Sequence, residues 1–128
     1  MKLEDQVCSL EMAKRLKELG VKQDGCYSWF ETQGGMVVRD TNDRIGGICL
    51  GSAFTVAELG EMLPDHIKIE EVTGTATFCF KSEKQDAGEW CASYDFVDTS
   101  CCYFMATTEA DARAKCLIYL IKNKLVKP

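Results

Sequence analysis

The chain has no long run of apolar residues and no obvious targeting segment. No stretch approaches the roughly 18 uninterrupted apolar residues that a membrane-spanning helix needs. The first seven residues, M-K-L-E-D-Q-V, lack the basic start and apolar continuation of a signal peptide. We therefore expect a cytoplasmic protein that does not associate with a membrane.

The sequence also lacks a dense run of basic residues. Fifteen lysine and arginine residues stand against twenty aspartate and glutamate residues, which gives a net charge of −5. Neutralising phosphates is the main source of affinity for nucleic acids, so this balance disfavours them as partners.

Cysteine is abundant, yet the spacing of a metal site is missing. The eight cysteines, at positions 8, 26, 49, 79, 91, 101, 102 and 116, include no C-x-x-C pair. Cys101 and Cys102 are adjacent, and on a strand their side chains point to opposite faces, which leaves them poorly placed to share an ion. We therefore predict no metal and no cofactor. Because Cys49, Cys79 and Cys116 lie in or beside apolar runs, most of the thiols are predicted to be reduced and buried.

The usual catalytic combinations are also absent. His66, in P-D-H-I-K, is the only histidine, and an activated nucleophile needs a base beside it. We interpret His66 as a solvated loop residue; the functional alternative pairs it with Cys49 or Cys79. Residues 46–52, G-G-I-C-L-G-S, lack the lysine of a phosphate-binding loop and are better explained as a loop entering a strand. No catalytic residue is assigned.

Helical patterning is the strongest signal in the chain. The longest predicted helix covers residues 107–125, with Thr108 as its N-cap and one apolar stripe formed by Ala110, Ala114, Leu117, Ile118, Ile121 and Leu125. A second helix is predicted from Ser9 to Leu19; residues 2–8 either extend it or form a loose arm. A third begins after Thr55, where Glu58 completes a capping box, and it ends before Pro64.

Alternating patterns predict strands between these helices. Two β-rich runs flank Gly34-Gly35, a loop covers residues 41–47, and I-C-L follows as a short strand. Residues 65–74 form a connection with a short extended piece. Further strands are predicted around residues 75–81, 89–96 and 102–105.

The order of helix, strands, helix, strands and helix predicts one α+β domain over residues 1–128. Hairpin-length turns favour a mainly antiparallel sheet. We expect three helices packed on both faces of this sheet; the alternative places them all on one face.

Three segments carry a resemblance to a known group of proteins: S-L-E-M-A-K-R-L-K-E-L-G-V, F-T-V-A-E-L-G-E-M-L-P and T-E-A-D-A-R-A-K-C-L-I-Y-L-I. Together they resemble small uncharacterised proteins encoded by bacteriophages and prophages. The resemblance implies an α-β-α sandwich and carries no catalytic residue.

Aromatic residues are the remaining candidates for binding. Trp29 shares a strand face with Tyr27, and Trp90 shares one with Tyr94, as aromatic residues at binding hot spots do. The preferred interpretation is that these side chains fill the core beneath the helices, because Trp90 alternates in step with Ala92 and Phe96; the binding role is the alternative. We therefore predict a phage-type accessory protein that binds another protein or a copy of itself, with Trp29, Trp90 and Tyr94 as candidate binding residues. The alternative is a small-ligand protein or an enzyme whose dispersed site depends on a thiol or on His66.

Overall fold

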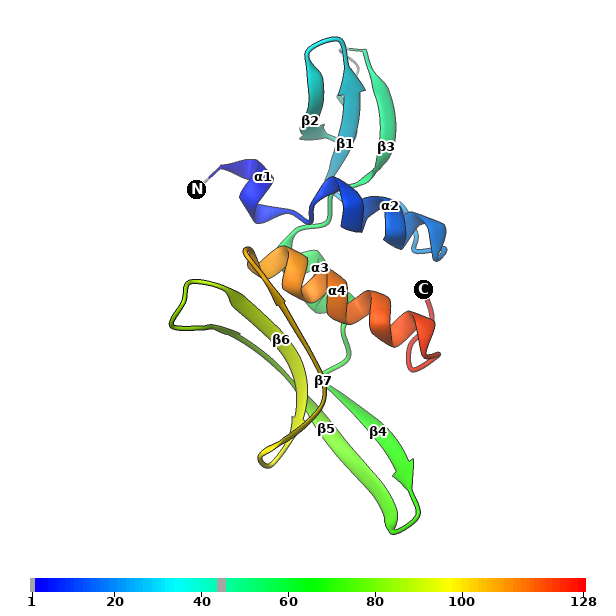
Figure 1. The fold of residues 1–128 in the computed structure, drawn as a ribbon. Helices are drawn as coiled ribbons and strands as arrows, with labels where there is room; N and C mark the ends of the chain where they lie inside the picture. Colours follow the sequence, from blue (N-terminus) through cyan, green and yellow to red (C-terminus); the bar gives the residue numbers. More distant parts are fainter. Residues whose placement is uncertain (1, 44–45) are drawn as a thin grey trace.

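The computed structural model describes residues 2–43 and 46–128, and this part of the chain forms helices and two antiparallel sheets (Figure 1). The helices are α1 (Leu3–Gln6), α2 (Leu10–Glu18), α3 (Val56–Met62) and α4 (Glu109–Lys122). The strands are β1 (Tyr27–Thr32), β2 (Gly35–Asp40), β3 (Ile48–Ser52), β4 (His66–Glu71), β5 (Gly74–Lys84), β6 (Trp90–Phe96) and β7 (Thr99–Ala106). The α+β class and the antiparallel pairing are confirmed.

The helices lie between two sheets, which corrects the prediction of one sheet covered on both faces. One sheet has the order β2-β1-β3 and the other β4-β5-β6-β7. Figure 1 shows α2, α3 and α4 in the layer between them. Helix α2 packs on β3, α4 packs on β5, β6 and β7, and α4 also contacts α2 and α3. Helix α3 follows β3 and lies in the helical layer. It therefore stands between strands β1 to β3, which form one sheet, and strands β4 to β7, which form the other.

Helix α4 is the central element of this layer. The hydroxyl of Thr108 accepts a hydrogen bond from the Asp111 N–H at 3.2 Å, which confirms the predicted cap. Its buried residues extend beyond the predicted stripe and are Ala110, Ala112, Ala114, Cys116, Leu117, Ile118, Leu120 and Ile121. A helix covered from several sides buries more than one face. The prediction for Leu125 was wrong: it lies beyond the end of the helix and is 37% exposed.

The four-stranded sheet covers α4 with one face and leaves the other face open. Alternation along β5 and β6 places Phe78, Ala92 and Tyr94 in the core beneath α4. Strand β4 is longer than the short extended piece predicted there, because all six of its residues pair with β5. No helix among the described residues has both the length and the apolar character of a membrane span.

The three-stranded sheet is built on the hairpin predicted from its glycines. Thr32 pairs with Gly35, so the turn residues are Gln33 and Gly34, one position earlier than the predicted pair. The following strand, β3, confirms the interpretation of residues 46–52 as a loop entering a strand. The loop predicted over residues 41–47 includes positions 44 and 45, which lie outside the described residues.

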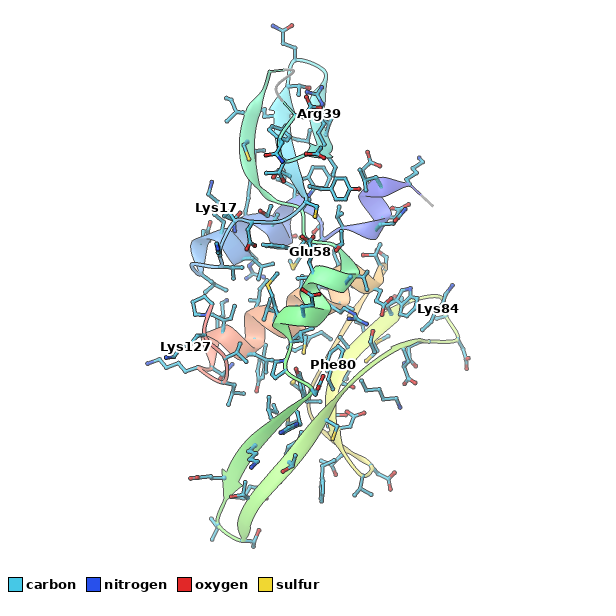
Figure 2. All side chains as sticks on the ribbon, turned by 180° about the vertical axis from the view of Figure 1, so that it is seen from behind. Lys17, Arg39, Glu58, Phe80, Lys84 and Lys127 are labelled. Carbon is cyan, nitrogen blue, oxygen red and sulfur yellow. The ribbon has the colours of Figure 1, made fainter. Side chains whose placement is uncertain are left out.

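Polar contacts join the three-stranded sheet to the helices. The capping box of α3 is confirmed, because the Glu58 carboxylate accepts the Thr55 N–H at 2.9 Å and the Thr55 hydroxyl accepts the Glu58 N–H at 3.1 Å. The second oxygen of Glu58, which Figure 2 labels, accepts the N–H of Cys26, just before β1, at 3.0 Å. One side chain therefore starts a helix and anchors a strand.

The chain before α2 forms a short helix of its own, which matches neither predicted alternative. Helix α1 ends at Gln6, and extended Val7 then makes an isolated bridge with Thr55. Ser9 caps α2, so the two helices are separate.

Candidate functional site

The three aromatic residues predicted to bind a partner lie in three different environments. Tyr94 is fully buried, its hydroxyl donates to the Pro64 carbonyl oxygen at 2.6 Å, and burial raises its pKa. Trp29 is half-buried, and its indole N–H donates to the Cys8 carbonyl oxygen at 2.9 Å. Trp90 lines a cavity. The structure therefore brings no two of them together in one binding surface.

The cavity beside Trp90 has a volume of about 780 Å³. It lies between α1, the first turns of α3 and α4, and the end of the β5–β6 hairpin, where Figure 2 labels Lys84. Its aromatic walls are Tyr27 and Trp90, and its charged side chains are Asp5, Lys84 and Glu109. Apolar walls with a few polar groups are typical of small-ligand sites.

The charge of Glu109 in this cavity is already balanced. Its carboxylate forms an ion pair with Arg113 at 2.9 Å and accepts the Ser82 hydroxyl at 2.8 Å. The Arg113 guanidinium also lies 5.4 Å from the centre of the Phe80 ring, which Figure 2 labels. This network fixes Glu109 and gives it a structural role between α4 and β5.

The two edge strands of the four-stranded sheet differ in charge. Strand β4 carries His66, Lys68, Glu70 and Glu71 among its six residues. Strand β7, T-S-C-C-Y-F-M-A, contains no charged residue, no proline and no glycine in eight residues. Charged side chains on an edge strand oppose pairing with a further strand, so β4 has this protection by charge and β7 lacks it.

The free edge of β7 is continuous with exposed apolar side chains. In the described part of the chain, β7 pairs with β6 on one side and has no strand on the other. Tyr103 is 64% exposed, and the Lys115 ammonium group donates to the Met105 carbonyl oxygen at 2.9 Å, near the end of the strand. The β6–β7 turn adds Phe96, 50% exposed, and Val97, 82% exposed. We call Phe96, Val97 and residues 99–106 the β7 edge.

The turn residue Val97 has an unusual backbone conformation. Its φ angle is 54°, in the left-handed region that favours glycine and is costly for a β-branched residue. Such a conformation costs on the order of 1 kcal/mol or more. Val97 is therefore both exposed and held in a costly backbone conformation, and folding requires neither.

The cysteines differ from their predicted placement. All eight are free thiols, but only Cys8, Cys102 and Cys116 are buried, while Cys49 and Cys79 are exposed. The prediction of burial was wrong for Cys79 because it alternates with Phe78 and Phe80, whose side chains turn toward the helices. Apolar neighbours along a strand therefore do not predict burial of the residue between them.

Cys101 and Cys102 do not point to opposite faces of β7, so the prediction made from their adjacency was wrong. The ladder shifts at a bulge, where Tyr94 pairs with Cys102 and Asp95 pairs with Ser100, so Cys101 is the extra residue. The two sulfur atoms lie 3.9 Å apart. Cys116 on α4 is near enough to Cys102 to influence the pKa of its thiol; we call these three cysteines the thiol cluster.

The thiols of this cluster have unequal acidity. The hydrogen bond with Cys116, together with that from Cys101, lowers the pKa of Cys102 to about 7 despite its burial. Burial and the neighbouring Cys102 raise the pKa of Cys101 to about 12. The hydrogen bond to Cys102 and burial also raise the pKa of Cys116. Cys102 is therefore the thiol of the cluster that ionises first.

His66 and Cys79 form a cross-strand pair on the open face of the sheet. They are directly opposite each other in the β4–β5 ladder, and both are exposed. His66 lies in a strand, where a loop had been predicted. Neither residue lines the cavity beside Trp90.

Comparisons with known protein families, with curated proteins and with solved structures find no match for this chain. Its function is therefore inferred from the geometry of its own residues.

Proposed function

We propose that the protein acts by self-association through the β7 edge, as a small cytoplasmic accessory protein of phage type. The observation that carries this proposal is the contrast between the charged edge strand β4 and the uncharged edge strand β7. Free N–H and C=O groups on an unprotected edge are a template for another strand. The phage setting is supported by the sequence resemblance alone.

A second copy of the chain is the occupant that fits this edge. Two β7 strands pair antiparallel about a two-fold axis perpendicular to the sheet, and this symmetry keeps both α4 helices on the same side. The two four-stranded sheets then continue as one sheet. Tyr103 and Phe96 add exposed apolar area beside the backbone hydrogen bonds.

Charge distinguishes self-association from binding to a basic partner. Two copies that each carry a net charge of −5 repel one another at long range, and salt screens this repulsion. Self-association should therefore strengthen as the salt concentration rises. Binding to a basic partner should weaken under the same change.

The experiment measures the oligomeric state of the reduced protein by sedimentation and native mass spectrometry over a range of protein and salt concentrations. Tyr103→Lys adds a positive charge to the β7 edge of each copy and should raise the dimer dissociation constant by about fivefold or more. Thr75→Lys is the matched control, because it adds the same charge to an exposed position on inner strand β5, opposite Glu70. A monomer at every concentration, or equal effects of the two variants, would contradict the proposal.

A second candidate function is binding of a small ligand in the cavity beside Trp90. Two aromatic side chains and three charged ones around about 780 Å³ favour a planar ligand with polar groups. Trp29→Phe leaves Trp90 as the only tryptophan, so its fluorescence can report on ligand screening. Quenching that Trp90 shows and a Tyr27→Ala variant loses would support this function; the absence of any response across the screen would count against it.

A further inference from the structure

A second cavity, with a volume of about 460 Å³, lies between the end of α2, helix α3 and the second half of α4. We call it the Phe54 cavity. Its apolar walls are Val21, Phe54, Met62, Leu117 and Ile121. Among the described residues, none lines both this cavity and the one beside Trp90. Its size and its walls suit the apolar body of a small ligand.

The residues after α4 turn back and form one wall of the Phe54 cavity. Lys124 has a φ angle of 58°, and the Leu125 N–H donates to the Leu120 carbonyl oxygen at 2.9 Å. A left-handed residue at this position reverses the chain at the end of a helix. Figure 1 shows the segment running from the end of α4 toward the end of α2, and its residues Lys127 and Pro128 line the cavity. The cavity is therefore bounded by segments that are far apart in the sequence.

Two carboxylates of α3 give the rim of this cavity a negative charge. Glu58 and Glu61 both line it, and they are three positions apart on one face of the helix. Glu58 is half-buried, and hydrogen bonds from the Thr55 and Cys26 N–H groups fix its carboxylate without neutralising its charge. A carboxylate has about four lone-pair sites, so Glu58 can accept a further donor. In the part of the chain that the structure describes, neither glutamate forms an ion pair with lysine or arginine.

The two lysines at the rim do not neutralise these carboxylates. Lys22 forms an ion pair with Asp24 at 3.9 Å, and both side chains are largely exposed to solvent. Lys127 is also exposed, and Figure 2 shows it in the C-terminal segment, well apart from Glu58 on α3. The side of the cavity that α3 forms is therefore negative.

We propose that the Phe54 cavity binds a small organic amine. The apolar body of the amine packs against Phe54 and Leu117, and its ammonium group donates hydrogen bonds to Glu58 and Glu61. An ammonium group has three donors, so one group can serve both carboxylates. Charge-assisted hydrogen bonds are stronger than neutral ones. An anion would be repelled by the two glutamates, and a neutral ligand would leave their charges unpaired, so a protonated amine fits both the walls and the rim.

This binding site goes beyond the proposed self-association and does not depend on it. No lining residue among those described belongs to the β7 edge. Amine binding by a chain that stays monomeric would refute only the self-association, and a dimer that binds no amine would refute only the amine site.

The test is an NMR titration of the full-length protein, with carbon-13 in its methionine methyl groups, against n-hexylammonium, n-hexanol and hexanoate. These probes share an apolar chain and differ in charge. Met62 lines the cavity and reports on binding, whereas Met36, exposed on β2, is the internal control. Hexylammonium should shift the Met62 resonance with a dissociation constant about fivefold or more below that of hexanol, and hexanoate should bind most weakly. The Met36 resonance should not move.

A pair of variants separates the cavity from the net charge of the protein. Glu61→Gln keeps the size of an exposed side chain and removes its charge, so it should weaken hexylammonium binding by about threefold to fivefold and leave hexanol binding unchanged. Glu11→Gln is the matched control, because it removes the same charge from an exposed position on α2 outside the cavity. Equal weakening in both variants would overturn the proposal. So would hexanol or hexanoate binding as tightly as hexylammonium, or a Met62 resonance that hexylammonium does not move.

Discussion

The two sheets share one helical layer but are held to it in different ways. The four-stranded sheet is covered by α4 and contributes Phe78, Ala92 and Tyr94 to the large core. The three-stranded sheet has a small cluster of its own, with Val7, Val38 and Ala53 as its buried members. Its other links to the helices include single hydrogen bonds, such as those of Glu58 and Trp29.

This difference indicates where stability and binding are located. Apolar burial is the dominant favourable contribution to folding, so the four-stranded sheet and α4 form the stable part of the molecule. The three-stranded sheet depends more on polar contacts, each worth about 1 kcal/mol. The β7 edge belongs to the stable part, where an unprotected strand is held rigidly enough to be recognised.

The largest expected effect comes from truncating the shared helix. Leu120 is fully buried on α4, and Leu120→Ala should lower the free energy of unfolding by about 3–4 kcal/mol. Val38→Ala, in the small cluster, should cost about 1–2 kcal/mol because it removes fewer buried methyl groups. Chemical denaturation measures both, and equal losses would contradict the contrast between the two sheets.

A pH effect should appear at the junction between the two parts. Cys8 is buried there, its N–H bonds the Phe54 carbonyl oxygen, and burial raises the pKa of its thiol from 9.0 to about 12. Below pH 9 the Cys8 thiol is neutral in both the folded and the unfolded chain, so the stability that depends on its neutral form is fully present. Above pH 9 the unfolded chain loses the proton first, and stability falls as the pH rises toward 12.

For this single thiol, the free energy of unfolding should fall by about 2 kcal/mol between pH 8 and pH 10.5. Denaturation curves of Cys8→Ala should show a smaller fall than wild type over the same range. Cys79→Ala, which removes an exposed thiol, should keep the wild-type slope. An unchanged slope in Cys8→Ala would contradict the assignment.

Glu58 should be worth more than an ordinary capping residue because it also holds β1. Glu58→Ala removes the acceptor for the Thr55 and Cys26 N–H groups and should cost about 2 kcal/mol. Glu61→Ala, on the exposed side of the same helix, should change stability little. Hydrogen exchange should show faster exchange at β1 in Glu58→Ala, with α4 less affected; equal acceleration in both elements would refute the local link.

The smallest effect is expected at the β6–β7 turn, and it is a gain. Val97→Gly relieves the positive φ angle and should raise the free energy of unfolding by about 0.5–1 kcal/mol. The midpoint of thermal unfolding gives this difference, and a loss of stability would show that the side chain of Val97 contributes contacts that outweigh its strain.

Local signals predicted the elements well because their causes are local. The capping box at Thr55 and Glu58, the Thr108 cap and the alternation of Trp90, Ala92 and Tyr94 all depend on residues a few positions apart. The separation of the strands into two sheets depends instead on how α3 crosses the molecule. The hydrophobic periodicity of the sequence does not predict this path of α3 between the two sheets.

The candidate sites were predicted less well for the same reason. The thiol cluster needs a bulge at Tyr94 and a third cysteine fourteen positions after Cys102 (102 to 116), and neither is visible in the spacing. The free edge of β7 depends on the order of strands in the sheet. Its one visible signal was composition, because T-S-C-C-Y-F-M-A carries no charge.

The most direct test of self-association compares hydrogen exchange at the two edge strands, β4 and β7, as the protein concentration is raised. If two copies pair through β7, amides of residues 99–104 gain protection with concentration while those of residues 66–71 do not change. Equal protection of both strands, or no change in β7 across a concentration range that spans measured dimer formation, would contradict the account.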